Sequence, residues 1–389
     1  MSHRLGVPLI REILASFRRR ELHASEAARR LELGRTRFYE LYSDYLRACA
    51  QRCEADWAPR TSGGDHAPEW HPDVEPLMRK LLSARPPAPY RFVASELQRR
   101  LGIDLDPATV RRWALAHDLA HPASSPRPSA PTRRWQCLKM GALWQLDATP
   151  HAWFAHHHRR QYPLLDLLDD CTRLSTGARI FHGEDLLAYF DFLPAAFREH
   201  GLPLELYVDC HSIFFPQRPD ALTQLGAALH FYGVSLRYAR TPQAKGKIER
   251  QHFYWQGRLP SLFAAENISS PEAANPLLQE LRLHRNAKET HRELGRTPDA
   301  AAALARKEGR DLLRQVPRCP WWPYVWSQRS WIKVGPDRRV PVGSQRLAVP
   351  LSPGSRVLHC LHPNGDVSLL AHEPKTGERP ALILSLPAF

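Results

Sequence analysis

Three acidic residues have the types and spacing of a metal-dependent phosphodiester site. Asp147 lies in an apolar, β-type run, Asp209 ends another such run, and Glu249 lies about one turn into an expected helix. Between them stand 61 and then 39 residues. Magnesium prefers oxygen ligands and typically takes one or two protein carboxylates together with substrate phosphates. The pattern therefore predicts that Asp147, Asp209 and Glu249 are catalytic and bind the metal.

The chemistry explains why three acids are needed. Two metal ions about 4 Å apart can activate an attacking oxygen and stabilise a leaving 3′ oxygen, whereas three neighbouring carboxylates repel one another unless a cation neutralises them. We therefore expect two Mg²⁺ or Mn²⁺ ions per active site, with Asp147 bridging them and Asp209 and Glu249 each binding one. Taken singly, an aspartate at a strand end often caps a turn, and a glutamate followed by arginine often forms a surface ion pair. For Asp169 and Asp170 we expect such a turn-capping role.

The charge balance indicates a polyanionic partner. Fifty-four Lys and Arg residues against 40 Asp and Glu give a net charge of +14, and the pI is near 9.7. This charge favours double-stranded DNA, with a merely basic surface or membrane-surface binding as alternatives. The absence of an 18-residue apolar run and of a signal-type stretch argues against a membrane protein. With seven scattered cysteines, these features favour a cytoplasmic, nucleoid-associated protein.

The expected helix around Glu249 is basic. Lys245 and Glu249 are four residues apart, so they share one helix face with His252 and Gln256. On that face Lys245 is expected to meet a phosphate and His252 to lie near the metals. A solvated amphipathic face is the alternative. The basic residues of this helix that we predict to bind DNA are Lys245, Lys247 and Arg250.

Two basic helical units precede the acids. In the first, a short helix, a turn at 32–34 and a helix at 36–42 form a helix-turn-helix pattern. In the second, a helix at 94–101 is followed by a turn and by a helix that Asp106 and Pro107 open. An ordinary helical hairpin is the alternative for the first unit. The side chains expected to reach bases or phosphates are Arg35, Arg37, Arg111 and Arg112.

A stretch rich in Pro, Ser and Arg separates these units from the acids. Its composition gives it little capacity to pack, so residues 121–135 are predicted to be a linker. We expect Arg133 and Arg134 to bind DNA phosphates; a passive spacer is the alternative.

Residues 141–260 alternate between strand and helix signals. We expect strands at 143–154, 161–169, 173–181, 204–209 and 234–238, and helices at 184–200, 218–232 and 245–262. Three strands followed by helix, strand, helix, strand and helix is the element order of a ribonuclease-H-like fold. Residues 271–306 are helical, and short β-type runs follow residue 329.

The expected fold is multidomain, with α and α/β parts. It comprises a helix-turn-helix unit at 1–53, a linker at 54–75, a second such unit at 76–120, a linker at 121–135, a ribonuclease-H-like catalytic core at 136–265, a helical extension at 266–316 and a C-terminal small β-barrel at 329–389.

Four sequence blocks resemble the integrase-type core of DDE transposases and retroviral integrases. The resemblance is closer to bacterial insertion-sequence transposases of the ISNCY type and extends from about residue 140 to 300. Each of the three predicted metal-binding acids lies in one block. The blocks are 144–147, 168–173, 207–214 and 242–250.

The resemblance implies a transposase. Such a protein binds the terminal inverted repeats of its element, cuts at the ends and joins the 3′ hydroxyls to target DNA, as a dimer or larger assembly. It also implies that the C-terminal strands form a small β-barrel. The alternatives are a catalytically inactive DNA-binding regulator derived from a transposase, and a plain metal-dependent nuclease.

One position departs from the pattern. Cys210 follows the second acid, where integrase cores commonly have Asn and ISNCY-type members often have Lys. Neighbouring strand residues point to opposite faces, so Cys210 is expected to face away from the metals.

A zinc finger is the competing interpretation of four residues near the N-terminus. Cys49, Cys53, His66 and His71 have the spacing of a Cys₂His₂ finger. Two glycines and Pro68 interrupt the helix on which the histidines would stand, so we expect no structural zinc there.

Overall fold

The computed structural model describes residues 6–51, 54–59, 70–121, 136–157, 159–209, 213–214, 222–239 and 245–387. The chain divides into two compact units, Met1–His71 and Pro72–Phe389. Arg133, Arg134, Cys210, Cys53 and His66 lie outside the described residues, so the predictions made for them stay untested.

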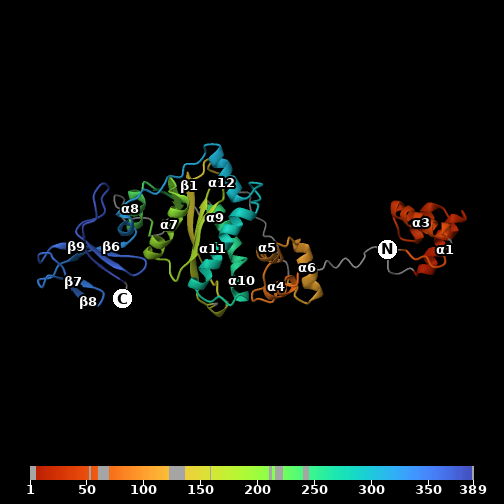
Figure 1. Ribbon diagram of the computed structural model, residues 1–389, viewed down its shortest axis with the longest axis horizontal. Helices are drawn as coiled ribbons and strands as arrows, with labels where there is room; N and C mark the ends of the chain where they lie inside the picture. Colours follow the sequence, from red (N-terminus) through yellow and green to blue (C-terminus); the bar gives the residue numbers. More distant parts are fainter. Residues whose placement is uncertain are drawn as a thin grey trace. The chain divides into compact units, whose positions relative to one another are not determined.

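The first unit is helical. Its helices are α1 (Val7–Arg18), α2 (Ala24–Arg30) and α3 (Arg35–Ala50), shown in red in Figure 1. Apolar side chains at helical spacing meet in one core, in which Leu14 and Phe38 are fully buried. The predicted helices and the turn before α3 are therefore present, while their use in DNA recognition remains a prediction.

A second helical group opens the second unit. It consists of α4 (Val74–Leu82), α5 (Tyr90–Leu101) and α6 (Pro107–Ala116). As predicted, Asp106 caps α6: its side chain accepts a hydrogen bond from the backbone N–H of Ala108 at 2.6 Å. The group is tied to the core, because Lys80 and Arg100 both form ion pairs with Glu266, at 2.7 Å each.

A five-stranded mixed sheet forms the centre of the second unit. Its strands are β1 (Leu143–His151), β2 (Tyr162–Asp169), β3 (Ser175–Ile180), β4 (Glu205–Val208) and β5 (Ser235–Tyr238), in the order β3-β2-β1-β4-β5. The first three strands are antiparallel neighbours, and β4 and β5 run parallel to β1. All five strands match predicted positions, and the order of strands and helices along the chain is the predicted one.

Helices cover both faces of this sheet. Alternate β1 residues such as Trp144 and Leu146 pack against α7 (Leu186–His200) and α8 (Gln224–Phe231). The intervening β1 residues face α9 (Gly246–Gln256), and α11 (Pro271–Lys288) packs against β3. The further helical elements are η1 (Ala155–His157), α10 (Leu259–Ala265), α12 (Pro298–Lys307) and α13 (Trp322–Val325).

One predicted helix is divided in two. The stretch 245–262 was expected to be continuous, but α9 ends at Gln256 and α10 starts at Leu259. Gly257 caps the end of α9, and Pro260 stands in the first turn of α10, where its missing N–H costs nothing.

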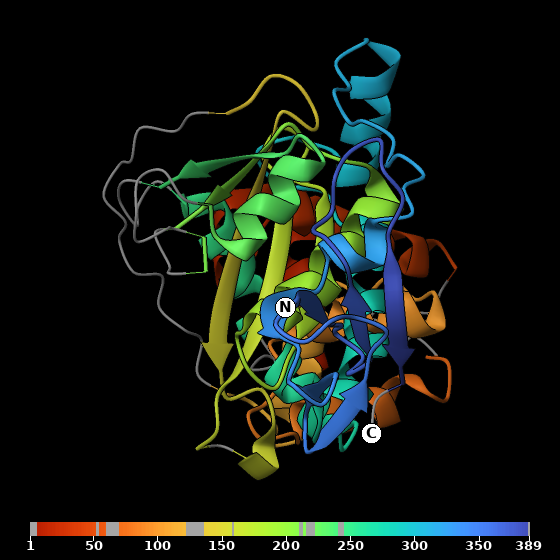
Figure 2. The ribbon, with the colours of Figure 1, turned by 90° about the vertical axis from the view of Figure 1, so that its left-hand side faces the viewer.

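The C-terminal strands differ from the predicted small β-barrel. Among the residues that the structure describes, they form an open sheet and a separate hairpin (Figure 2, blue, nearest the viewer). The sheet runs β11-β10-β9-β6, and its edge strands β6 and β11 do not pair, so no closed barrel is formed. The strands are β6 (Gln328–Lys333), β7 (Arg339–Val342), β8 (Gln345–Ala348), β9 (Arg356–Leu361), β10 (Val367–Leu370) and β11 (Leu382–Leu386).

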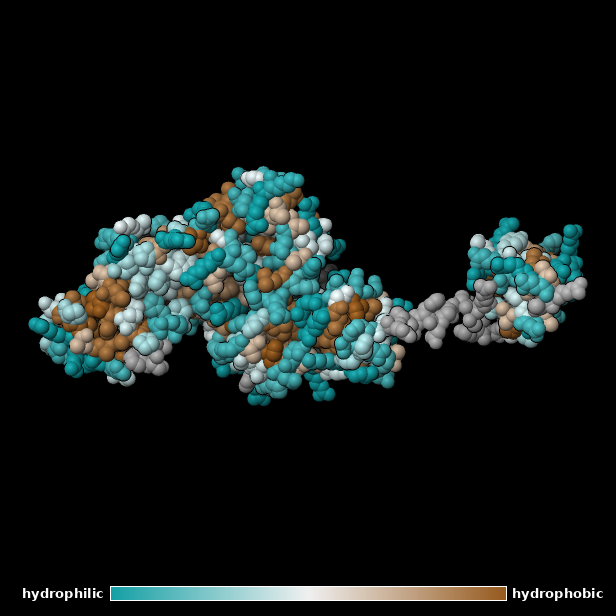
Figure 3. All heavy atoms as spheres, viewed as in Figure 1, coloured by the Kyte–Doolittle hydropathy of each residue, from teal (hydrophilic) through white to brown (hydrophobic). Residues whose placement is uncertain are grey.

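The surface carries scattered apolar side chains. Figure 3 shows a hydrophobic patch over the C-terminal strands. Two exposed large apolar side chains in these strands are Trp331, 38% exposed, and Leu382, 49% exposed. Within the described part of the chain, no helix is long and apolar enough to cross a membrane.

Candidate active site

Asp147 lies in the middle of the central strand, on the face that meets α9. Lys245, at the start of α9, donates from Nζ to Asp147 Oδ1 at 2.7 Å. The Nδ1 atom of His252 lies 3.9 Å from Asp147 Oδ2. The Lys245 side chain is only 5% exposed, so this ion pair is largely shielded from water.

The other two acids act electrostatically on Asp147. Burial raises the pKa of the Asp147 carboxyl, the Lys245 charge opposes this rise, and the Asp209 charge adds to it. Burial likewise raises the pKa of Glu249, and the Asp147 charge raises it further. Asp209 follows the last residue of β4, which runs parallel to β1. The fold thus brings Asp209 and Glu249, which are far from Asp147 in sequence, within reach of the Asp147 charge.

The donor set fits a hard divalent cation, although no tight ligand group is formed. Among the described residues, no three His, Cys, Asp or Glu side chains lie close enough together to hold a metal ion. Lys245 neutralises Asp147 instead. Within the described part of the chain, the buried Nε2 atom of His252 has no hydrogen-bond partner, and burial lowers the pKa of this imidazole to about 4, so it is neutral. Carboxylate oxygens are the ligands that Mg²⁺ and Mn²⁺ prefer.

A buried polar network fixes α9 on the sheet. Asp166 of β2 lies opposite Asp147 in the antiparallel pairing of β2 with β1, and it is fully buried. It accepts hydrogen bonds from Gln251 Nε2 at 2.5 Å and from Trp255 Nε1 at 3.1 Å. Arg285 of α11 donates to Gln251 Oε1 at 2.5 Å. These contacts hold the helix that carries Glu249, and they give both carboxyl oxygens of the buried Asp166 a hydrogen-bond donor.

Two further contacts join α9 to β1. Gln256 Nε2 donates to Thr149 Oγ1 at 2.9 Å, and Gln145 Oε1 accepts from the backbone N–H of Ile248 at 3.3 Å. The face shared by Lys245, His252 and Gln256 therefore meets β1 rather than solvent, and the predicted grouping of these residues on one face is confirmed.

The remaining basic residues of α9 have protein partners. Lys247 Nζ lies 2.5 Å from Asp170 Oδ1 and is 17% exposed. Arg250, 59% exposed, forms an ion pair with Glu293 at 2.9 Å. Lys247 is thus turned into the protein, and only Arg250 of the two is open to a DNA phosphate.

Asp169 caps the turn after β2, as predicted, whereas Asp170 differs from the prediction because its side chain accepts from Gln145 of β1 and Lys247 of α9. Asp169 Oδ1 accepts from the backbone N–H groups of Cys171 and Thr172, and its Oδ2 accepts from Gly141. Asp170 accepts from the backbone N–H of Cys137 at 2.7 Å.

The arginines predicted to bind DNA lie on helix surfaces. Arg35 and Arg37 are exposed in the first turn of α3, and Arg37 pairs with Glu40 at 2.7 Å. Arg111 and Arg112 are exposed on α6, where Arg112 donates to Thr109 Oγ1 at 3.0 Å.

Asp166 and its partners were not predicted as part of the site. The signal was a single carboxylate in the otherwise apolar run 164–168. A charged residue in a strand buried on both faces needs partners, and those partners come from α9 and α11, which sequence spacing does not connect to β2.

Comparison with known proteins gives two sequence relatives. The transposase for insertion sequence IS1202 from Streptococcus pneumoniae is 32% identical over 170 residues, covering 42% of this chain and 35% of the relative. The putative transposase y4bF from Sinorhizobium fredii (strain NBRC 101917 / NGR234) is 29% identical over 192 residues, covering 48% of this chain and 42% of the relative. The chain thus spans less than half the length of either match, and no family model matches it. The predicted resemblance to insertion-sequence transposases is confirmed.

Solved structures with a similar fold include integrases. The catalytic core domain of HTLV-2 integrase, in complex with magnesium, has a TM-score of 0.34 at 16% identity, covering 42% of this chain and 97% of that one. A chain of the simian T-cell lymphotropic virus intasome, in complex with a PP2A regulatory subunit, has a TM-score of 0.38 at 15% identity, covering 76% and 99%. Both TM-scores are below 0.5, so these likenesses add nothing to the functional conclusion.

Proposed function

We propose that this chain is a DDE-type DNA transposase that binds the terminal inverted repeats of an insertion sequence and catalyses metal-dependent DNA cleavage and strand transfer. The observation that carries the proposal is the grouping around Asp147. Asp209 and Glu249 act on it electrostatically, and Lys245 and His252 line it. The two transposase relatives support the same reading.

In this proposal each residue has a distinct task. Asp147, Asp209 and Glu249 hold divalent cations, which supply the Lewis acidity for attack on a phosphodiester. Lys245 binds the phosphate that is attacked, and the neutral His252 fills the space beside Asp147 without adding charge. Asp166, Gln251 and Arg285 are positioning residues, because they fix α9 without touching the substrate.

DNA recognition is assigned to the basic surfaces. The exposed arginines of α3 and α6 contact the element ends, and the chain works on paired ends as a homodimer or larger assembly. The net charge of +14 supports a polyanionic partner.

The test replaces each acid with its uncharged counterpart. Asp147→Asn, Asp209→Asn and Glu249→Gln should each lower cleavage and joining of a labelled end fragment by at least about 100-fold, since a metal contributes several kcal/mol to charge stabilisation. DNA affinity should stay unchanged. Asp337→Asn removes an exposed acid of the C-terminal region and serves as the matched control, with wild-type rates expected. Near-full activity of any one site variant refutes the role of that acid.

A further inference from the structure

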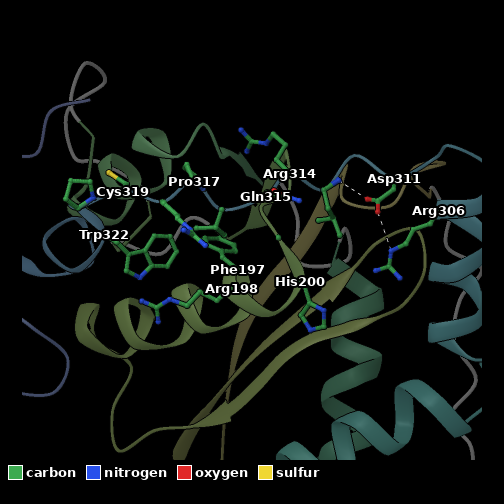
Figure 4. Close-up of a pocket in the computed structure, with 15 residues that line it drawn as sticks. Phe197, Arg198, His200, Arg306, Asp311, Arg314, Gln315, Pro317, Cys319 and Trp322 are labelled. Atoms are coloured by element: carbon green, nitrogen blue, oxygen red, sulfur yellow. Dashed lines mark hydrogen bonds and ion pairs between the residues drawn. The ribbon is translucent and has the colours of Figure 1, made fainter. Parts of the chain in front are cut away.

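A second cationic feature lies away from the three acids. A hollow of about 900 Å³ is formed by the end of α7 and the segment between α12 and α13 (Figure 4). Four arginines and a histidine line it, against a single acid, Asp311. We call it the arginine hollow, and its charged lining residues are Arg198, His200, Arg306, Asp311, Arg314 and Arg318.

The floor of the arginine hollow is fixed to the sheet. Leu202 and Arg314 exchange two backbone hydrogen bonds, at 2.8 and 3.0 Å. The Arg314 side chain donates to the carbonyl oxygens of Pro203 and Gly233, at 2.9 and 2.8 Å. Arg314 is thus a structural element of the floor, and the hollow is built into the fold rather than left by a loose loop.

Besides Arg314, whose side chain bonds to backbone carbonyls, two of the arginines have no acidic partner among the described residues. Within the described residues, neither Arg198 nor Arg318 forms an ion pair. The guanidinium of Arg198 lies 4.8 Å from the ring centroid of Trp322. Both side chains are drawn in Figure 4. Stacking of this kind fixes the plane of the guanidinium and leaves its N–H edge available for bidentate contact with a phosphate. Arg306 is 3.5 Å from Asp311, too long for a strong hydrogen bond.

The arginine hollow and the acids lie at opposite ends of β4. Gly201 precedes the strand and lines the hollow, whereas Asp209 follows it. The six residue-to-residue steps from Pro203 to Asp209 span roughly 20 Å in extended chain. A phosphate bound in the hollow is therefore not the phosphate of the bond that is cut at the three acids.

We infer that the arginine hollow binds the sugar-phosphate backbone of duplex DNA, at phosphates roughly 20 Å from the bond that is cut. The inference rests on the proposed function for the identity of the polyanion. The hollow is large enough for more than one phosphate. Because its arginines would contact backbone phosphates and not base edges, binding is independent of base sequence. This adds a second DNA-binding surface, separate from the helices of the N-terminal units.

The test measures duplex binding as a function of salt, with full-length protein and two duplexes of unrelated sequence. The variant Arg198→Gln/Arg318→Gln should reduce the slope of log affinity against log salt by about 2, equally for both duplexes, because two phosphate contacts are lost. The single variant Arg318→Gln, which breaks no stacking contact, should reduce it by about 1. This readout needs no cleavage, so it is informative even if the acids prove inactive.

The matched control removes the same charge elsewhere. Arg356 also stacks on a tryptophan, at 5.5 Å from the Trp331 ring, and Arg339 is exposed nearby. Arg339→Gln/Arg356→Gln should leave the slope as in wild type. An unchanged slope in both hollow variants overturns the inference. So does a change in oligomeric state with unaltered duplex binding, which would mark the hollow as a contact for another protein chain.

Discussion

Lys245 occupies the position where a metal ion would neutralise Asp147. Its ammonium group contacts Oδ1 at 2.7 Å and is almost completely buried. Lys245 would therefore compete with a divalent cation for the Asp147 carboxylate. In the proposed function, a Lys245 side chain released from Asp147 would be free to contact a phosphate.

This competition predicts opposite effects on two measurements. Lys245→Gln should tighten Mn²⁺ binding by about tenfold, because it removes a positive charge whose repulsion of the cation at short range is worth at least about 1 kcal/mol. DNA joining should fall. Electron paramagnetic resonance of free Mn²⁺ measures the first effect directly. Lys247→Gln is the matched control, because Lys247 pairs with Asp170 and not with Asp147; its Mn²⁺ affinity should be unchanged. Weaker Mn²⁺ binding in Lys245→Gln would show that Lys245 supports the metal site rather than competes with it.

At the scale of elements, α9 is held on the sheet by the carboxyl group of Asp166, which is not one of the three predicted metal-binding acids. Asp166 is buried directly beside Asp147, and it bonds to Gln251 and Trp255. Burial raises the pKa of Asp166 to about 7. The orientation of the helix that bears Glu249 thus depends on a polar contact within the core.

Asp166→Ala should destabilise the protein by about 2–5 kcal/mol, because two buried donors lose their acceptor. Thermal unfolding measures the loss. Asp166→Asn keeps the shape and should cost less. The pH dependence gives a sharper signature: the folded pKa lies above the ordinary value, so the wild type loses stability as pH rises from about 4 to 7. The asparagine variant lacks this loss. The difference in its free energy of unfolding from wild type should therefore shrink as pH rises from about 4 to 7. A constant deficit would mean that Asp166 is ionised when folded.

The sequence predicted the elements better than the contacts between them. The five central strands and the helices that follow them are visible in apolar periodicity, which is a local property. The division at Gly257 and Pro260 was missed because the apolar pattern continues across it. The contacts of Asp166 with α9 and of Arg314 with β4 were also missed, since both join segments that are distant in sequence. The C-terminal strands were recognised individually, but whether edge strands close into a barrel depends on pairing that strand propensity does not determine.

At the scale of the whole molecule, positive charge is spread over both units. Arg35 and Arg37 lie in the first unit, whereas Arg111, Arg112 and the arginine hollow lie in the second. Recognition of an element end is therefore expected to use several separate contacts, each contributing to the salt dependence.

Replacing these pairs tests their contribution to end binding. Arg35→Ala/Arg37→Ala and Arg111→Ala/Arg112→Ala should each weaken binding of an end fragment and reduce the salt slope by up to about 2. Fluorescence anisotropy measures both quantities. A variant that loses its preference for the end fragment over a random duplex has lost base contacts. A variant whose affinity falls equally for both duplexes has lost phosphate contacts. End binding that is unaffected by either pair would refute the helix-turn-helix assignment.

The central claim is that the three acids make this chain a metal-dependent DNA-cutting and DNA-joining enzyme. The most direct measurement incubates purified full-length protein with a labelled end fragment and a target duplex, in Mg²⁺, in Mn²⁺ and in EDTA. We predict cleavage at the element end and joined product with either metal, and neither with EDTA. Protein that binds the end fragment but forms no cleaved or joined product in Mn²⁺ would contradict the account and identify the chain as a DNA-binding regulator.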